Sequence, residues 1–501
     1  MAITSTIPNA GISGMALYVP RLRVDLERWC HWTGNDWGKV SQVAGSSFRV
    51  CGPRENVYTM AANAVLRLIE KYDIDPERVG MLALGTESSR DNAVGAVIVR
   101  GMVDQALPIL GLPRLSRNLE VPEFKHACLA GVYALKAALR YVCSDGASRD
   151  AIVVAGDIAQ YERGSSGEQT QGAGAVAMLV QRHAKMLQID LMHAGTASAY
   201  RGPDFRKPFA RYQSPEYQEH AKYLRDFPVF SGKYSTLSYL DEIVHAVEGM
   251  LLRLGSDDVD YFPRVHTWFF HRPYRMMPIQ AMSFLCVRRL AHGREETWDA
   301  LEALCAAAGV HARDVIDETS RHPDLYAAIQ ADCAGIDNHY AATISAARAL
   351  RSTGEFKSLV EQKMSLGNQA VLQLGNLYSA ALPAWLAAGI EDAHLRSIDL
   401  TGEPMVMLGY GSGDAAEAIP MLAPTGWQEA ASRIRIAESL AHPTDLTQTQ
   451  YESIHNGEDD PCSNHPRRRE FVISHVGSKY EKEFQDLGVE YYDYVTETAA
   501  E

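Results

Sequence analysis

Short apolar runs alternate with longer amphipathic stretches along most of this chain. Several apolar runs are bounded by glycine or turn residues, which predicts buried strands; they cover 79–88, 151–159, 174–180, 267–273 and 403–413. Apolar residues recur at helical spacing over 58–72, 129–142 and 374–389, and residues 285–360 are rich in Ala, Leu, Arg and Glu, so these segments are predicted to be helices. Alternating strands and helices predict a layered α/β fold.

The same order of predicted elements occurs in both halves of the chain: a strand, a helix whose first turn contains candidate catalytic or binding residues, and then glycine-rich strands. This order favours a duplicated α/β unit. We predict an N-terminal half over 1–190, a C-terminal half with a helical insertion over 191–424, and an extension over 425–501 that packs on the core.

Composition narrows the class of protein. The chain has 501 residues, of which 46% are hydrophobic and 22% charged, as in ordinary globular proteins. A formal net charge of −14 argues against nucleic-acid binding. The longest apolar run, 380–390, is about half of what a membrane span needs, and the first residues lack the pattern of a signal peptide. The cysteines are scattered without metal-ligand spacing, so we expect no metal site and a reducing, cytoplasmic setting.

Cys128 is the first candidate for chemistry. It directly precedes the helix predicted over 129–142, whose peptide dipoles are expected to lower the pKa of the thiol. The neighbouring Ala127, Ala130 and Gly131 are small enough to admit a substrate. A thiolate in such a place suits acyl transfer from a thioester. The alternative is a buried cysteine at a helix start.

Two further side chains follow predicted strands. His271 could act as a base or orient an acyl group, and Glu87 could be a general acid or base if an apolar site raises its pKa. A structural histidine and a turn-capping carboxylate are the alternatives. Asn376 and Ser379 stand at the predicted start of the helix over 374–389, where Asn376 could bind a carbonyl or simply cap the helix.

Together these segments resemble the 3-hydroxy-3-methylglutaryl-CoA synthase family of the thiolase superfamily, including members that act on carrier-protein-bound chains in polyketide β-branching. The strings ALGTES, KHACLAG, VVAGDIAQY, TQGAGAVA, PDFRKP, SGKYSTLSYL, FFHRPY, LGNLYSAAL and GYGSG occur in the order typical of the family. The resemblance implies a duplicated five-layer αβαβα fold and a homodimer. It implies acyl-CoA or acyl carrier protein as substrate, and neither metal nor redox cofactor.

The resemblance also implies a reaction. A cysteine takes an acetyl group from acetyl-CoA or an acetyl carrier protein, the acetyl thioester adds as a carbon nucleophile to the β-ketone of an acceptor thioester, and hydrolysis releases the product. By position in the family motifs, Cys128 is the nucleophile, Glu87 the general acid/base, and His271 the residue that orients the acceptor. The remaining implied site residues are Asn376 and Ser412 in the acyl pocket and Asp157 and Asp204 in supporting positions. The reaction also needs an oxyanion hole, and our hypothesis is that a backbone N–H near Gly411–Gly413 is a donor to it.

The chain departs from the family pattern at several positions. Leu129 stands where the family has a tyrosine, Gln171 where it has a glycine, and Met276 where it has a lysine that contacts CoA phosphates; Arg272 and Arg275 are predicted to replace that lysine. Alternative functions are a Claisen-type ketosynthase or acyltransferase, and a non-catalytic paralogue. Glu87 in its GTES context favours the aldol-type reaction.

Overall fold

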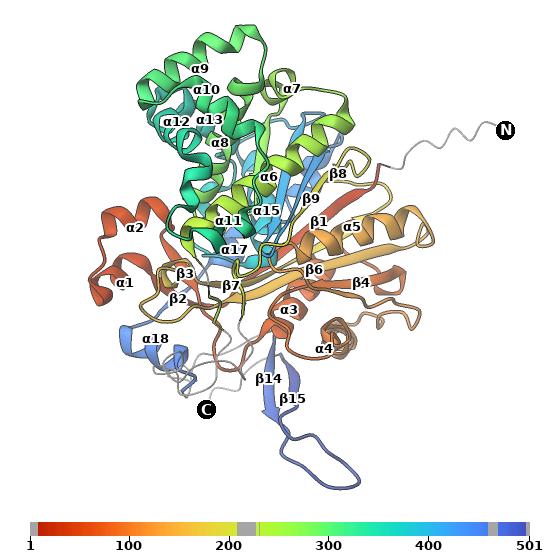
Figure 1. Ribbon diagram of the computed structural model, residues 1–501. Helices are drawn as coiled ribbons and strands as arrows, with labels where there is room; N and C mark the ends of the chain where they lie inside the picture. The colour runs from red at the N-terminus through yellow and green to blue at the C-terminus, as the bar shows by residue number, and fades with distance from the viewer. Residues whose placement is uncertain (1–8, 208–226, 230, 459–468, 497–501) are drawn as a thin grey trace, which may run out of the picture.

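The computed structural model describes residues 9–207, 227–229, 231–458 and 469–496 (Figure 1). Its largest sheet has 10 strands in the order β10-β11-β12-β8-β1-β7-β6-β4-β5, with β9 paired to β12. The N-terminal strands are β1 (Gly11–Tyr18), β4 (Val79–Gly85), β5 (Glu123–Phe124), β6 (Asp150–Ala159) and β7 (Gly172–Gln181). The C-terminal strands are β8 (Leu187–Ile189), β9 (Gly195–Ser198), β10 (Thr267–Phe270), β11 (Met405–Gly411) and β12 (Ala415–Leu422).

Strand pairing repeats between the two halves. In the first half β1 pairs with β7 and β7 with β6 in antiparallel fashion, and β6 pairs with β4 in parallel. In the second half β9, β12, β11 and β10 pair in the same sequence of directions. Short β8 joins the halves, because it pairs with both β1 and β12. The duplicated α/β architecture predicted from the sequence is therefore present.

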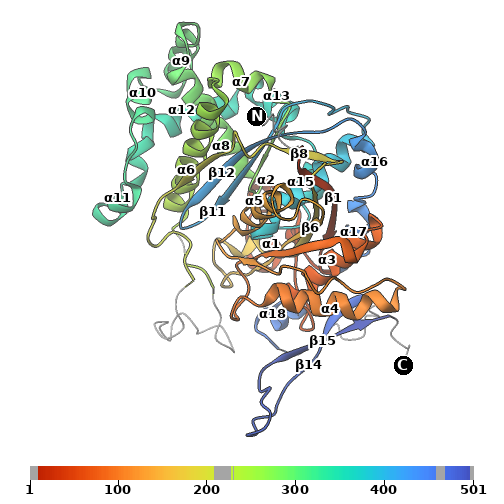
Figure 2. The same ribbon diagram turned by 90° about the vertical axis from the view of Figure 1, so that its right-hand side faces the viewer.

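Helices form three layers around the two halves of the sheet. Helices α3 (Val57–Lys71) and α4 (Gly95–Ile109) cover the outer face of the first half, and α6 (Gly232–Leu254) and α8 (Met276–His292) lie on the far side of the second half (Figures 1 and 2). Between the halves lie α5 (Ala130–Cys143), which packs on β4, β6 and β7, and α15 (Ala381–Leu395), which packs on β1, β10 and β11. This arrangement gives the expected five layers, and the ends of β4, β10 and β11 meet around the start of α5.

The remaining elements surround this body. Five helices follow α8 as the predicted helical insertion: α9 (Glu295–Ala308), α10 (Ala312–Ser320), α11 (Leu325–Ala331), α12 (Ala341–Ser352) and α13 (Gly354–Met364). β2 (Leu22–Asp25), β3 (Ser47–Arg49) and β13 (Thr444–Asp445) form a small sheet beside α18 (Gln448–His455). The hairpin of β14 (Glu470–Val476) and β15 (Glu490–Val495) packs on α3 and α4 and projects from the body (Figure 2). None of the described helices is both long and apolar enough to span a bilayer. The domain boundaries at 190 and 424 stay predictions.

The helix predicted over 374–389 begins later than expected. Residues 374–380 instead form an irregular segment that ends in the single 3₁₀ turn Tyr378–Ala380, and α15 starts at Ala381. The Asn376 side chain accepts a hydrogen bond from the Tyr378 N–H (2.8 Å), and Tyr378 has a φ of 44°, outside the helical region. Tertiary contacts therefore override the helical periodicity of this segment.

Candidate active site

Cys128 lies in a tight turn formed by residues 126–129, two residues before α5 begins. The Leu129 N–H donates to the His126 carbonyl (3.0 Å), and Ala127 has a φ of 43°, a strained conformation for a residue with a side chain. A Cβ on Gly411 would lie 2.7 Å from the His126 carbonyl oxygen and 2.9 Å from the Leu129 nitrogen. Glycine at the end of β11 therefore lets the second half support the turn that holds the nucleophile.

The sulfur is buried among aromatic side chains. Cys128 is 7% exposed and forms a cluster with Ala159, Tyr161 and Tyr378, against which Phe205 packs. The Phe205 and Tyr378 rings meet edge to face with centroids 5.9 Å apart. This apolar, aromatic surrounding removes water from the thiol.

Glu87 contacts the thiol directly. It follows β4, and its Oε2 lies 3.7 Å from the Cys128 Sγ, while its Oε1 lies 3.5 Å from the Lys207 Nζ. Burial raises the pKa of Glu87 to about 7, with Lys207 lowering it and Asp157 raising it less strongly. The raised pKa agrees with the expectation from the sequence, and such a carboxyl group suits general acid/base chemistry; the catalytic role of Glu87 stays a prediction.

The pKa of the Cys128 thiol differs from the sequence-based expectation. Burial raises it well above its usual value, and the charges of Glu87 and Asp157 raise it further. The predicted lowering by the helix dipole is therefore wrong for the free enzyme: the sulfur lies outside the first turn of α5, in a desolvated place next to carboxylates.

His271 lies beyond the end of β10 and shares a cavity with Cys128. This cavity measures about 300 Å³, at the lower end of the roughly 300–1,000 Å³ typical of ligand sites. Burial lowers the pKa of His271 to about 3, so the imidazole is neutral near physiological pH. Within the described residues its Nδ1 atom is buried without a hydrogen-bond partner. The position of the His271 ring on the cavity wall is compatible with the predicted role in orienting a ligand.

Asn376 and Ser412, both predicted to line the acyl pocket, do line this cavity, together with Tyr410 and Met276. Leu129 does not. Its side chain packs where a Cβ on Gly409 or Gly411 would lie, so the replacement of the family tyrosine changes the packing behind the nucleophile rather than the wall of the cavity.

Asp157 holds the site together from outside the cavity. Its Oδ1 accepts hydrogen bonds from the Thr86 hydroxyl (2.7 Å), the Glu87 N–H (2.8 Å), and the N–H (2.9 Å) and hydroxyl (2.8 Å) of Ser88. Its Oδ2 accepts from the Ser379 N–H (2.9 Å) and hydroxyl. Asp157 therefore ties the strand end that carries Glu87 to the 3₁₀ turn of the second half. This geometry supports a positioning role rather than substrate contact.

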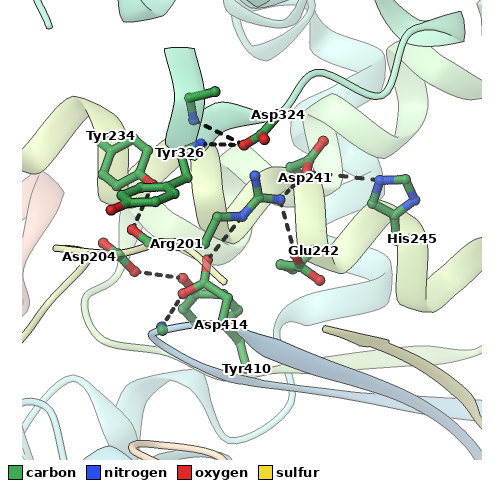
Figure 3. A network of polar contacts seen from close by, with 12 residues as sticks. Arg201, Asp204, Tyr234, Asp241, Glu242, His245, Asp324, Tyr326, Tyr410 and Asp414 are labelled. Carbon is green, nitrogen blue, oxygen red and sulfur yellow. Dashed lines mark hydrogen bonds and ion pairs between the residues drawn. The ribbon is translucent and has the colours of Figure 1, made fainter. Parts of the chain in front are cut away.

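Asp204 also lies behind the cavity wall. Its Oδ2 accepts a hydrogen bond from the Tyr410 hydroxyl (3.2 Å; Figure 3), and its carboxyl group lies close enough to that of Asp414 for their charges to interact. Burial, and then the charge of Asp204, raise the pKa of Asp414 to about 9. Arg201 lies beside Asp414, with its Nε 3.7 Å from Oδ2, and pairs with carboxylates of α6. Since the Tyr410 ring stacks on His271 (centroids 6.4 Å apart), Asp204 supports the wall that holds the imidazole.

Two predicted ligand contacts do not fit their surroundings. The Arg272 guanidinium is buried over the Trp385 ring (5.2 Å to the centroid) and donates to the Asn368 side chain (2.6 Å), which argues against contact with CoA phosphates. Within the segment 411–413, where an oxyanion donor was expected, the Gly413 N–H donates to the Asp414 carboxyl group, which removes that N–H as a donor. Arg275 donates to the Ser41 carbonyl (3.3 Å), and its contact with CoA stays a prediction.

Several side chains at the site were absent from the sequence-based prediction: Tyr161, Phe205, Lys207, Tyr378 and Tyr410. All five positions occur in the strings that carry the family resemblance, namely VVAGDIAQY, PDFRKP, LGNLYSAAL and GYGSG. The strings show that these residues are present, but which side chains point at the sulfur depends on loops that pack together from both halves.

Comparison with known proteins gives a consistent result. The family model described as the N-terminal part of hydroxymethylglutaryl-coenzyme A synthase matches residues 7–185. The hydroxymethylglutaryl-CoA synthase of Haloferax volcanii is 26% identical over 461 residues, covering 89% of this chain and 91% of the relative. The corresponding enzyme of Fusarium sp is 29% identical over 425 residues, covering 82% of each chain.

Solved structures share the fold. MvaS in complex with 3-hydroxy-3-methylglutaryl coenzyme A superimposes with a TM-score of 0.74 at 23% identity, covering 97% of this chain and 99% of that chain. The curacin biosynthetic pathway HMG synthase in complex with an acetyl donor-ACP gives a TM-score of 0.67 at 20% identity, covering 97% and 100%. The family model spans the half that carries Cys128 and Glu87, and the similarity to the synthases extends over more than 80% of the chain. The chain is therefore similar to hydroxymethylglutaryl-CoA synthases over most of its length, and its residues 7–185 match the N-terminal model of that family.

Proposed function

We propose that this protein is an acyltransferase that joins a short acyl thioester to a β-ketoacyl thioester by aldol-type addition. The observation that carries the proposal is the position of the Cys128 sulfur, 3.7 Å from Glu87 and on the wall of the cavity that also contains His271. A thiol, a carboxyl group that titrates near pH 7 and a neutral imidazole are the groups that this reaction needs.

In the first half-reaction the Cys128 sulfur attacks the donor thioester carbonyl, and the donor thiol leaves. In the second, a proton leaves the methyl carbon of the acetyl-cysteine, and the resulting carbon nucleophile adds to the β-ketone of the acceptor. Glu87 exchanges the proton in this step, and His271 binds the acceptor oxygen through its ring. Water then cleaves the acyl bond to Cys128 and releases the product.

The donor is acetyl-CoA or an acetyl carrier protein. MvaS has been solved with a CoA thioester and the curacin enzyme with an acetyl donor-ACP, so relatives of this chain use both kinds of carrier. Met276 lies on the cavity wall of this chain where the family has a lysine that contacts CoA phosphates. Because methionine carries no charge, this position favours an acceptor whose carrier is bound without an ion pair here.

Two further properties belong to the proposal. We propose a homodimer, on the strength of the family resemblance. We also propose a cytoplasmic location, because none of the described cysteines forms a disulfide and the buried nucleophile needs a reduced thiol. Light scattering coupled to size-exclusion chromatography tests the first property.

The test of the function starts with acylation. After incubation with acetyl-CoA, intact mass should increase by one acetyl group in the wild type and in Cys143→Ala, which removes an exposed thiol, but not in Cys128→Ala. No adduct on the wild type, from either acetyl-CoA or acetyl carrier protein, would contradict the proposal and favour a non-catalytic paralogue.

The second stage tests condensation. The acetylated wild type should convert acetoacetyl-CoA or an acetoacetyl carrier protein to the branched product, detected by mass spectrometry, and Glu87→Gln should lose this activity. Acetylation followed by formation of a linear β-ketone, or by simple transfer of the acetyl group, would instead indicate a ketosynthase or acyltransferase.

A further inference from the structure

The buried nucleophile presents a problem of charge. Cys128 and Glu87 lie 3.7 Å apart in an apolar surrounding, and the Asp157 carboxylate is close to both. A thiolate formed there would be a further negative charge with little solvent to stabilise it. Acyl transfer therefore needs both an acceptor for the thiol proton and a positive charge nearby.

Lys207 provides a positive charge at the right place. It lies in the segment after β9, with a side chain that is 32% exposed. Its Nζ is 3.5 Å from the Glu87 Oε1 and 6.0 Å from the centroid of the Tyr378 ring. Among the residues that the structure describes, Lys207 makes the one ion pair of Glu87. The two carboxylate oxygens thus divide their contacts, Oε1 toward the ammonium group and Oε2 toward the sulfur.

The other groups that face Glu87 cannot replace this cation. Tyr161, beyond the end of β6, and Tyr378, in the turn before α15, carry phenols whose pKa is raised by burial, so both are neutral. Asp157, on β6, accepts hydrogen bonds from Thr86, Ser88 and Ser379, which hold its charge in place.

We propose that Lys207 is a positioning residue that balances the charge of a Cys128–Glu87–Lys207 chain, through which Glu87 accepts the thiol proton during acylation. The inference rests on the proposed function and extends it to the first half-reaction. As the Sγ–acyl bond forms, the proton passes from Sγ to the Glu87 carboxylate. As the bond to the donor sulfur breaks, Glu87 returns this proton to the leaving thiolate. The carboxylate is then ionised again beside the ammonium group, ready for the condensation step.

The test measures the thiol without any acyl substrate. The rate at which iodoacetamide alkylates Cys128 is followed by peptide mass spectrometry as a function of pH, with exposed Cys333 in the same protein as internal reference. Lys207→Gln should shift the Cys128 profile upward by roughly 1–2 pH units, and Lys207→Arg should keep the wild-type profile. The matched control is Lys71→Gln, which breaks an ion pair of similar length (3.4 Å to Glu438) far from the sulfur.

Two results would overturn the inference. One is a Lys207→Gln profile that coincides with that of the wild type; the other is a Lys207→Arg profile shifted as far as that of Lys207→Gln. Acetylation by acetyl-CoA is measured on the same proteins. If the alkylation profile depends on Lys207 but the wild type is not acetylated, the proposed function fails and the charge balance stands. If the wild type is acetylated but the profile does not depend on Lys207, the charge balance fails and the proposed function stands.

Discussion

A buried ion pair connects the two halves of the molecule through α5, the helix that follows the nucleophile. The Lys136 Nζ on α5 lies 2.5 Å from the Glu417 Oε1 on β12, and the Thr196 hydroxyl on β9 donates to Oε2 (3.0 Å). The Lys136 side chain is 9% exposed, and that of Glu417 is 0% exposed. Replacing Lys136 with Met keeps an unbranched side chain of nearly the same length but leaves the carboxylate buried without its cation.

We expect Lys136→Met to lower the free energy of unfolding by about 3–5 kcal/mol, the usual cost of breaking a buried ion pair from one side. An unfolding entropy of about 2.1 cal/mol/K per residue, taken over the whole chain, converts this loss into a melting temperature lower by about 3–5 °C. Differential scanning calorimetry measures the shift directly.

The double variant Lys136→Met/Glu417→Gln is the decisive comparison. It removes both charges, so the buried group that remains is a neutral amide beside the Thr196 hydroxyl, and it should recover roughly 2 kcal/mol relative to Lys136→Met. The reasoning is refuted if Lys136→Met melts within 1 °C of the wild type, or if the double variant melts no higher than Lys136→Met.

Two other predictions follow from the site. Gly411→Ala should slow acetylation of Cys128 by roughly 10²-fold, because its Cβ would lie 2.7 Å from the His126 carbonyl and displace the turn. The control Gly101→Ala, with open space around its Cβ, should be acetylated at the wild-type rate, and equal rates for the two variants would contradict this packing argument. The pKa of His271, lowered to about 3 from about 6.5 in the unfolded chain, means that only the unfolded state binds this proton at intermediate pH. The free energy of unfolding of the wild type should therefore fall as the pH drops below about 6.5, by about 1.4 kcal/mol per pH unit more than that of His271→Asn. Melting temperatures of both proteins at pH 8 and 5.5 measure this difference, and an equal decrease in the two proteins would rule it out.

Local patterns along the chain were enough to predict much of the architecture. The apolar runs over 79–88 and 151–159 became β4 and β6, and the periodic stretch over 58–72 became α3, because strands and helices with buried faces carry their period in the sequence itself. The sequence showed Cys128 directly before a predicted helix and Glu87 and His271 after predicted strands, and the structure places Glu87 against the sulfur and His271 on the wall of the same cavity.

Other features depend on contacts between distant parts of the chain. The segment over 374–380 has helical periodicity, yet its path follows hydrogen bonds from Ser379 to Asp157, 222 residues away. Arg272 was a candidate for phosphate binding from its sequence position, but Trp385 and Asn368 hold it inside the protein.

The same distinction between local sequence and tertiary contacts explains the raised pKa of the Cys128 thiol. The sequence by itself determined that a cysteine precedes a helix, whereas the raised pKa of its thiol results from burial and from carboxylates that other strands bring close. Lys207 reaches Glu87 only because the segment after β9 folds across the first half. Desolvation and Coulomb interactions depend on distances in space, and a sequence specifies those distances only once the two halves have packed together.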